Sequence, residues 1–199
     1  MTFEIRVPAS TSNLGPGFDC FGLALKLYLT ARATAVPHGT EPCHVVTTGA
    51  KENEALPHNA TNLMYRAMSF ATRRENVSLP PVDLRVHNEI PLASGLGSSA
   101  AAIVAGIKLG ALITGHDIPD QRIQNYATEF EGHPDNVAAS LYGGFLASCT
   151  CHDGAVTSAK FNWPTQIRVV VVSPRSQLPT HVARAALPRT ECPQLRVRR

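Results

Sequence analysis

Residues Pro91 to Ala101 read PLASGLGSSAA and separate a segment of alternating apolar residues from a run of small apolar residues. Gly95 and Gly97 have no Cβ, so the backbone amides there can approach an anion closely and adopt positive φ. Ser98 and Ser99 occupy the first positions of the expected helix, where unpaired N–H groups and the helix dipole favour negative charge. The stretch therefore predicts a loop that cradles phosphate groups, with a serine hydroxyl in reach of a phosphate-bound Mg²⁺.

Other interpretations of this loop are an ordinary turn capped by serine and two further phosphate-binding motifs. A Walker loop needs Gly-Lys-Ser/Thr at the helix start, and the nearest lysine, Lys108, lies far down the helix. A dinucleotide-binding motif fits Gly95-x-Gly97-x-x-Ala100, with Asp117 about 20 residues further on. Against it, the preceding segment alternates polar and apolar residues and ends in proline, whereas the first strand of a dinucleotide-binding fold is usually buried on both faces.

Two more polar motifs lie on either side of this loop in the sequence. Residues 8–19, PASTSNLGPGFD, form a turn-rich segment that presents Asn13 and Asp19, which suit an ammonium or hydroxyl group. Residues 129–136, EFEGHPDN, hold carboxylates, an imidazole and an amide just after an expected helix. Each segment also has a purely structural interpretation. Residues 8–19 would then be a turn capped by its own side chains, and residues 129–136 a helix end stopped by glycine and proline.

The remaining pattern predicts a mixture of strands and helices. A short strand over residues 3–7 should end at Pro8, and helical spacing begins at Thr61, where Thr61 or Asn62 could cap the helix. Further strands are expected at 25–35, 44–48, 84–90, 144–150, 156–161 and 167–172, and further helices at 98–113 and 119–131. Since strands and helices do not alternate strictly, this order favours an α+β domain.

The composition excludes several classes of protein. The chain has 199 residues, of which 44% are hydrophobic and 17% charged, as in an ordinary globular protein. The net charge is +3, but its distribution argues against nucleic-acid binding, because the segment from Arg184 onward carries +4 and the rest of the chain therefore −1. Five cysteines without C-x-x-C spacing suit a reducing compartment. With no signal-peptide pattern and no apolar stretch long enough to span a bilayer, we expect a cytoplasmic protein that does not bind a membrane.

The segments PASTSNLGPGFDCFGLAL, IPLASGLGSSAA and EGHPDNVAASLYGGF, in this order, resemble homoserine kinases of the GHMP small-molecule kinase superfamily. The likeness runs from the first strand to about Thr190. It implies a GHMP kinase amino-terminal, ATP-binding domain of the ribosomal protein S5 domain 2-like fold over residues 1–165. Residues 166–190 would begin the carboxyl-terminal ferredoxin-like domain, most of which is then missing, and residues 191–199 would be a tail that does not look native.

The resemblance also implies roles for individual residues. The loop would bind the ATP phosphates through Pro91, Leu92, Ala93, Ser94, Gly95, Leu96, Gly97, Ser98, Ser99, Ala100 and Ala101. The Mg²⁺ site would consist of Ser98 or Ser99 with Glu129, and Glu131 is close enough in sequence to compete. The positions that match the family's homoserine pocket are Asn13, Asp19, His133, Asn136, Thr180 and Arg184, with Arg184 gripping the amino-acid carboxylate as a bidentate fork.

The catalytic candidates are Asn136, Asp135 and Arg184. The γ-phosphoryl group passes through a loose transition state, so positioning and charge neutralisation matter more than covalent chemistry. Asp19 and Arg184 would hold the charged ends of the substrate with its hydroxyl in line for attack. Superfamily relatives often place an aspartate near the acceptor hydroxyl, but Asn136 takes that neighbourhood here, and an amide is no base. We therefore expect direct transfer without a strong protein base, with Asp135 as the alternative.

The expected function is ATP-dependent phosphorylation of L-homoserine to O-phospho-L-homoserine in threonine biosynthesis. ATP and Mg²⁺ are the expected cofactors, L-homoserine is the expected partner, and a homodimer is left open for the full-length form. Three alternatives remain: another GHMP small-molecule kinase, an inactive kinase fragment that binds nucleotide only, and a dinucleotide-dependent oxidoreductase. The missing second half makes a complete, closed active site doubtful and should leave apolar surface exposed.

Overall fold

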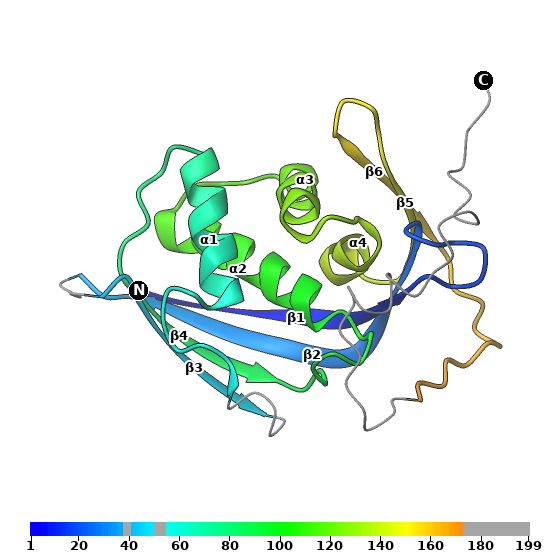
Figure 1. Ribbon diagram of the computed structural model, residues 1–199, viewed down its shortest axis with the longest axis horizontal. Coiled ribbons are helices and arrows are strands. Elements are labelled where there is room, and N and C mark those ends of the chain that lie inside the picture. Colours follow the sequence, from blue (N-terminus) through cyan, green and yellow to red (C-terminus); the bar gives the residue numbers. More distant parts are fainter. Residues whose placement is uncertain (38–40, 50–54, 173–199) are drawn as a thin grey trace.

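The computed structural model describes residues 1–37, 41–49 and 55–172, which form a mixed sheet with helices on one face (Figure 1). The strands are β1 (Thr2–Ser12), β2 (Phe21–Ala35), β3 (Cys43–Gly49), β4 (Val82–Asn88), β5 (Phe145–Thr150) and β6 (Val156–Phe161). The helices are α1 (Leu63–Arg74), α2 (Ser98–Thr114), α3 (Asp120–Glu131) and α4 (Asp135–Tyr142). The strand order is β3-β4-β2-β5-β6, with β1 also paired to β2, and β3 and β4 run parallel. This arrangement confirms the expected α+β class.

The long strand β2 organises the sheet, because it pairs with β1 along one edge and with both β4 and β5 along the other. Its alternation is as expected: Leu29, Ala31 and Ala33 are buried toward the helices, while Arg32 is exposed. The expectation that the first strand ends at Pro8 was wrong, since β1 continues to Ser12. The register between β1 and β2 shifts between Pro8 and Ala9, so the proline is accommodated at a bulge and the strand goes on beyond it.

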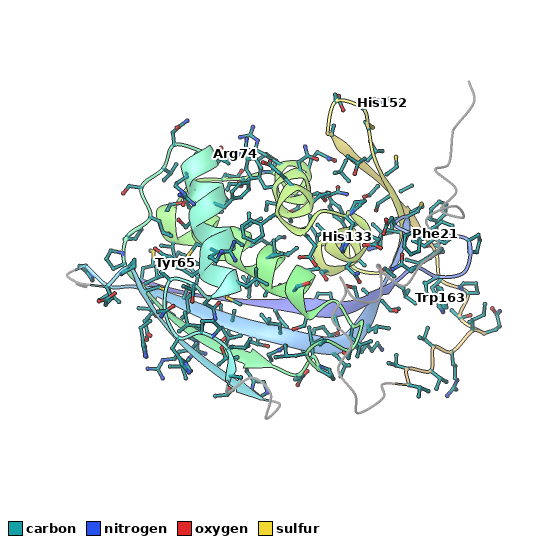
Figure 2. The ribbon with its side chains drawn as sticks, in the orientation of Figure 1. Phe21, Tyr65, Arg74, His133, His152 and Trp163 are labelled. Carbon is teal, nitrogen blue, oxygen red and sulfur yellow. The ribbon has the colours of Figure 1, made fainter. Side chains whose placement is uncertain are left out.

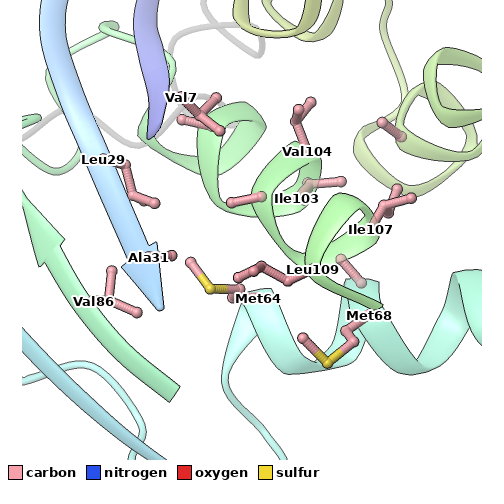
Figure 3. Packing of buried hydrophobic residues seen from close by; sticks show 14 of the residues in the cluster. Val7, Leu29, Ala31, Met64, Met68, Val86, Ile103, Val104, Ile107 and Leu109 are labelled. Atoms are coloured by element: carbon pink, nitrogen blue, oxygen red, sulfur yellow. The ribbon is translucent and has the colours of Figure 1, made fainter. Parts of the chain in front are cut away.

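Helices α1 and α2 pack closely over the sheet, where Met68, Ile103, Ile107 and Leu109 are fully buried (Figure 3). Asn62 caps α1 by accepting the Met64 N–H at 3.0 Å, which confirms one of the two expected caps. The close approach depends on Gly106 of α2, because a Cβ there would overlap the carbonyl oxygen of Met64. Glycine is thus required at this helix contact although it weakens the helix itself.

We expect Gly106→Ala to lower the free energy of unfolding by roughly 1–3 kcal/mol, as overpacking in a core does. The overlap is with a backbone atom, so no change of rotamer relieves it, and α1 must move away from α2. Chemical denaturation measures the effect, with Leu112→Ala as a control at an exposed position of the same helix. Equal or higher stability of the Gly106 variant would contradict this helix contact.

A second structural centre is Glu75, which follows α1 and links it to the α2–α3 connection and to α3. Its carboxylate accepts hydrogen bonds from Tyr126 Oη at 2.7 Å, Arg122 Nη1 at 2.8 Å and His116 Nε2 at 2.9 Å, and its side chain is 7% exposed. Burial by itself raises the pKa of Glu75, but these three hydrogen bonds outweigh it and lower the pKa below its usual value. The folded state therefore stabilises the ionised carboxylate of Glu75 relative to its protonated form.

Because this pKa is lowered on folding, Glu75 stabilises the protein above the usual carboxyl pKa of 4.5, and that stability is lost as the pH falls through the lower folded value. We expect Glu75→Gln to lower the midpoint of thermal unfolding at neutral pH by several degrees. The variant should also lose stability less steeply than the parent below pH 4.5. Thermal unfolding between about pH 3 and 8 checks this, with the exposed Glu41→Gln as control; parallel pH profiles for all three proteins would rule out the role of Glu75.

Two segments of the described chain differ from the elements that the sequence predicts. Helix α4 was not predicted, because Gly132 and Pro134 were interpreted as an end and the new helix, only eight residues long, begins directly after them. The strand expected at 167–172 was wrong: this segment pairs with no strand among the described residues, and Val170 and Val172 are 83% and 86% exposed. An apolar segment becomes a strand only where a neighbour completes its hydrogen bonds.

The expected domain boundaries stay predictions. Of the expected second segment, 166–190, the structure describes only 166–172, and the expected tail, 191–199, lies outside the described residues. Among the described helices, none combines the length and the apolar character that a membrane span needs.

Candidate active site

A cavity of about 540 Å³ lies where the 91–99 loop, the end of β1 and the starts of α1 and α4 meet. It brings together the three polar motifs of the sequence. Its polar and loop lining consists of Ser12, Asn13, Thr47, Thr61, Asn62, Asn88, Pro91, Leu92, Ala93, Ser94, Gly95, Leu96, Gly97, Ser98, Ser99, Glu131, His133 and Asn136. The apolar lining, which the sequence did not reveal, includes Leu29, Leu56, Pro57, Leu63, Met64, Val86 and Ala102.

The loop is tied to β1 where it approaches α2. Leu96 C=O accepts the Ser10 N–H at 3.1 Å, which ties the loop to β1. Gly97 has φ of 69°, and a Cβ there would overlap Ser10 Oγ and lie 3.1 Å from Asn136 Oδ1. Ala93 also adopts a left-handed φ, of 50°, which costs an alanine about 1 kcal/mol. Glycine at 97 is thus required both by conformation and by space.

The loop leads directly into the amino terminus of α2. Its first intrahelical hydrogen bond runs from Ala101 N–H to Gly97 C=O at 2.9 Å, and the glycine at the cap position has no side chain to bond the helix end. The N–H groups of Ser98, Ser99 and Ala100 therefore have no acceptor within the helix. Such a helix end, facing a cavity, is suited to bind an anion.

Glu131, not Glu129, lies at this helix end. The Ser99 hydroxyl donates to Glu131 Oε1, and both residues line the cavity. Burial raises the pKa of Glu131, and the hydrogen bond from Ser99 offsets only part of that effect. Glu129, which the sequence predicts as the metal ligand, instead pairs with Arg74 and does not line the cavity, whereas its competitor Glu131 does.

The oxygens at this point fit Mg²⁺. A carboxylate and a serine hydroxyl are hard oxygen donors, and Mg²⁺ typically takes one or two carboxylates together with substrate phosphates. Burial disfavours the ionised form of Glu131, and a cation beside its carboxylate would offset this effect by favouring the negative charge. In the described structure Ser99 is in contact with Glu131, whereas Ser98 Oγ accepts from Asn88 Nδ2 at 3.4 Å.

Asn136 is held by two serines of β1. Ser10 Oγ donates to Asn136 Oδ1 at 3.0 Å, and Asn136 Nδ2 donates to Ser12 Oγ at 2.9 Å, so the orientation of the amide is fixed. Sequence reasoning did not single out Ser10 and Ser12, although their alternate spacing on one strand places them on the same face. Since Asn136 lines the cavity, this network sets one of its walls.

Asp135 lies behind this wall and not on it. Its side chain is completely buried, and Asp135 Oδ1 accepts from His133 Nδ1 at 3.0 Å and from the Asn136 N–H at 2.7 Å. Burial raises its pKa, but the bonds from His133 and Asn136 outweigh burial and lower the pKa. Because Asp135 does not line the cavity, this geometry does not favour the alternative in which Asp135 takes a proton from a substrate there. Asp135 positions His133, which lies at the cavity beside α4 (Figure 2).

The structure brings together some of the expected substrate residues and not others. Asn13 lines the cavity, and its Oδ1 accepts the Asp19 N–H at 2.9 Å, which closes the 13–19 turn. Both residues have left-handed φ, of 59° and 52°. Asp19 is part of this turn but does not line the cavity. Thr180 and Arg184 lie outside the described residues.

Comparison with known proteins agrees with this fold. Residues 62–144 match the family model "GHMP kinases N terminal domain". Homoserine kinases are among the proteins similar to it in sequence. The one from Deinococcus radiodurans is 40% identical over 187 residues, and the one from Shouchella clausii is 41% identical over 188; each alignment covers 94% of this chain. The chain spans 59% and 60% of the lengths of these two relatives.

Solved structures agree on the fold. Homoserine kinase from Cytophaga hutchinsonii superposes with a TM-score of 0.77 at 24% identity, over 94% of this chain and 60% of that one. Mevalonate kinase from L. major superposes with a TM-score of 0.61 at 16% identity, over 80% of this chain and 52% of that one. At these identities the likeness concerns the fold alone.

Proposed function

We propose that this chain forms the nucleotide-binding part of a kinase that transfers the γ-phosphoryl group of ATP to L-homoserine, giving O-phospho-L-homoserine for threonine biosynthesis. The observation that carries the proposal is the meeting, in one cavity, of an uncapped helix amino terminus, the Ser99–Glu131 pair and Asn136. The homoserine kinases that align with 94% of the chain support the choice of acceptor.

In the proposed complex, the loop amides and the start of α2 bind the triphosphate. The apolar wall, which includes Leu56, Pro57 and Val86, offers a surface for the nucleoside. Ser99 and Glu131 would hold Mg²⁺, which supplies charge neutralisation on the phosphates when it is bound. The antiparallel pairing of β4 with β2, and its alternating burial, speak against a dinucleotide-binding fold.

At the acceptor side, Asn136, His133 and Asn13 would orient the amino-acid hydroxyl by hydrogen bonds. Asp135 would keep the His133 ring in one orientation, and Ser10 and Ser12 would do the same for Asn136. We infer direct transfer to the hydroxyl without a strong protein base, since the amide of Asn136 cannot accept the proton and Asp135 is buried. Asp19, Thr180 and Arg184 remain proposed contacts to the charged ends of the substrate.

The test is ATP turnover by the purified chain with Mg²⁺, with and without L-homoserine, in which O-phosphohomoserine is detected directly. Homoserine-dependent product supports the whole proposal. Tight ATP binding without product, measured by calorimetry on the same sample, would favour the narrower function of nucleotide binding alone. Product from mevalonate or galactose but not from homoserine would assign another acceptor, and NAD(P)H binding that ATP does not displace would contradict the kinase proposal.

A further inference from the structure

Strand β1 forms an edge of the sheet, because among the described residues it pairs with β2 only. Its first half, Thr2–Val7, comes before the bulge at Pro8 and reads TFEIRV. An edge strand of this length presents unpaired backbone groups, which in natural proteins are either protected or used for pairing.

The direction of these backbone groups follows from the ladder. Ala35 N–H donates to Met1 C=O at 3.3 Å, so Met1 belongs to the residues that hydrogen-bond to β2. In an antiparallel pair such residues alternate with ones whose N–H and C=O point away from the partner. Thr2, Glu4 and Arg6 therefore direct their backbone groups to the open edge. The close contact of Thr2 Oγ1 and Thr34 Oγ1, at 2.9 Å, agrees with this assignment, because side chains approach most closely at pairs without backbone hydrogen bonds.

The side chains of the same segment are self-complementary in charge. Glu4 and Arg6 stand one residue before and one after Ile5 and lie on the exposed face of the sheet. If a second β1 pairs antiparallel with Ile5 opposite Ile5, then Glu4 of each copy faces Arg6 of the other. Glu4 and Arg6 are also the residues whose backbone groups point outward, so one register satisfies the charges and the hydrogen bonds together. Other registers, such as Glu4 opposite Glu4, place like charges together and are destabilised.

The helix side of this edge is incompletely covered. An open groove of about 840 Å³ lies beside it, lined by Phe3 and Ile5 of β1 and by Leu112, Ile113, Ile118 and Ile123 among others. Phe3 and Ile5 are only half-buried, although they point toward the helices. In the register above, Phe3 and Ile5 of the second copy would lie beside this groove and cover part of it.

We propose that β1 of one chain pairs antiparallel with β1 of a second copy, about a two-fold axis at Ile5, so that two sheets join into one. Charged residues on an edge strand usually oppose pairing. Here each strand carries one negative and one positive charge at equal distance from the axis. Glu4 of each copy therefore faces Arg6 of the other, and the opposite charges attract. Pro8 and the bulge end the paired segment. This inference does not depend on the proposed function, since the axis lies outside the candidate active site.

The test uses reversal of the two charges in the full chain, followed by sedimentation equilibrium over a range of concentrations. Glu4→Arg alone and Arg6→Glu alone place like charges opposite each other twice, so each should weaken dimerisation by roughly tenfold or more. The double variant Glu4→Arg/Arg6→Glu restores opposite charges and should return the dissociation constant to near that of the parent. Circular dichroism confirms that each variant is folded.

The matched control is Arg32→Gln, which removes the partner that Glu4 binds at 2.7 Å within the chain and leaves the β1 charges unchanged. It should dimerise like the parent. As a second readout, the amides of Glu4 and Arg6 should gain protection from hydrogen exchange as the concentration rises, while those of Phe3 and Ile5 are protected throughout. A parent chain that stays monomeric at every concentration overturns the proposal, as does a folded double variant that dimerises no better than the single ones.

Discussion

Gly97→Ala should weaken nucleotide binding strongly, while Gly95→Ala should retain it. Both glycines have left-handed φ, 69° and 74°, so an alanine at either position carries a similar backbone strain of about 1 kcal/mol. The two sites differ in space. A Cβ at Gly97 would overlap Ser10 Oγ and lie 3.0 Å from Ser10 C=O, whereas a Cβ at Gly95 has no atom within 4 Å. The comparison therefore separates overlap from strain.

Relief of the overlap at Gly97 must move the loop away from β1 or displace Ser10 from Asn136. The first movement displaces the amides at the start of α2, which we propose bind the phosphates, and the second releases Asn136 at the wall of the same cavity. We expect ATP affinity of the Gly97 variant to fall by roughly 100-fold or more, which corresponds to about 3 kcal/mol. Calorimetric titration with Mg·ATP measures it for both variants. Equal affinities for the two variants would show that the contact of the loop with Ser10 plays no part in binding.

Glu131→Gln should have the second large effect. It should lower activity but should not lower the stability of the metal-free protein. Removing the charge should lower Mg²⁺-dependent phosphoryl transfer by roughly 100-fold or more, because a bound metal supplies several kcal/mol of charge stabilisation. If the chain shows no turnover, ATP affinity is measured with and without Mg²⁺ instead. Mg²⁺ should increase the ATP affinity of the parent but not that of the variant. Glu129→Gln is the matched control, since Glu129 pairs with Arg74 away from the cavity, and it should behave like the parent.

The same substitution should not destabilise the metal-free protein at neutral pH. Because burial raises the pKa of Glu131, the folded state binds its proton more tightly than the unfolded state does. The stability linked to this proton is complete below the usual carboxyl pKa and is lost as the pH rises through the folded value. At neutral pH the ionised Glu131 therefore costs stability, and the uncharged amide of the Glu131→Gln variant removes that cost. Thermal unfolding without Mg²⁺ should give an equal or higher midpoint for the variant, and a clear decrease would contradict this account.

The phosphate-binding loop could be predicted from sequence because its determinants are local. Gly95, Gly97, Ser98 and Ser99 are close together in the chain, and their conformational and capping properties do not depend on distant residues. The α+β class was predictable for the same reason, since alternation along β2 and the small apolar residues of α2 show directly in the sequence. A feature that one continuous segment determines can therefore be predicted from the local sequence pattern.

The choice between Glu129 and Glu131 could not be made this way. Residues two apart on a helix point in widely different directions, so only one of them can face the cavity. Which one does so depends on the rotation of α3 about its axis, and packing against other helices sets that rotation. The apolar wall was hidden for a related reason, because Leu56 and Val86 come from segments that meet only in the folded chain. Helix α4 was missed because a proline next to a short helix looks like an end as much as a beginning.

Ser10 has a consequence for how this site can change in evolution. Its side chain occupies the space beside Gly97 and also donates to Asn136, so a single residue belongs to the wall of the phosphate loop and to that of the proposed acceptor pocket. A substitution at position 10 would alter both at once. Altered acceptor preference should therefore arise more readily through residues such as Asn13, which lines the cavity but does not take part in the contact between Ser10 and Gly97. The chemistry of the nucleotide side would then be inherited unchanged while the choice of acceptor drifts.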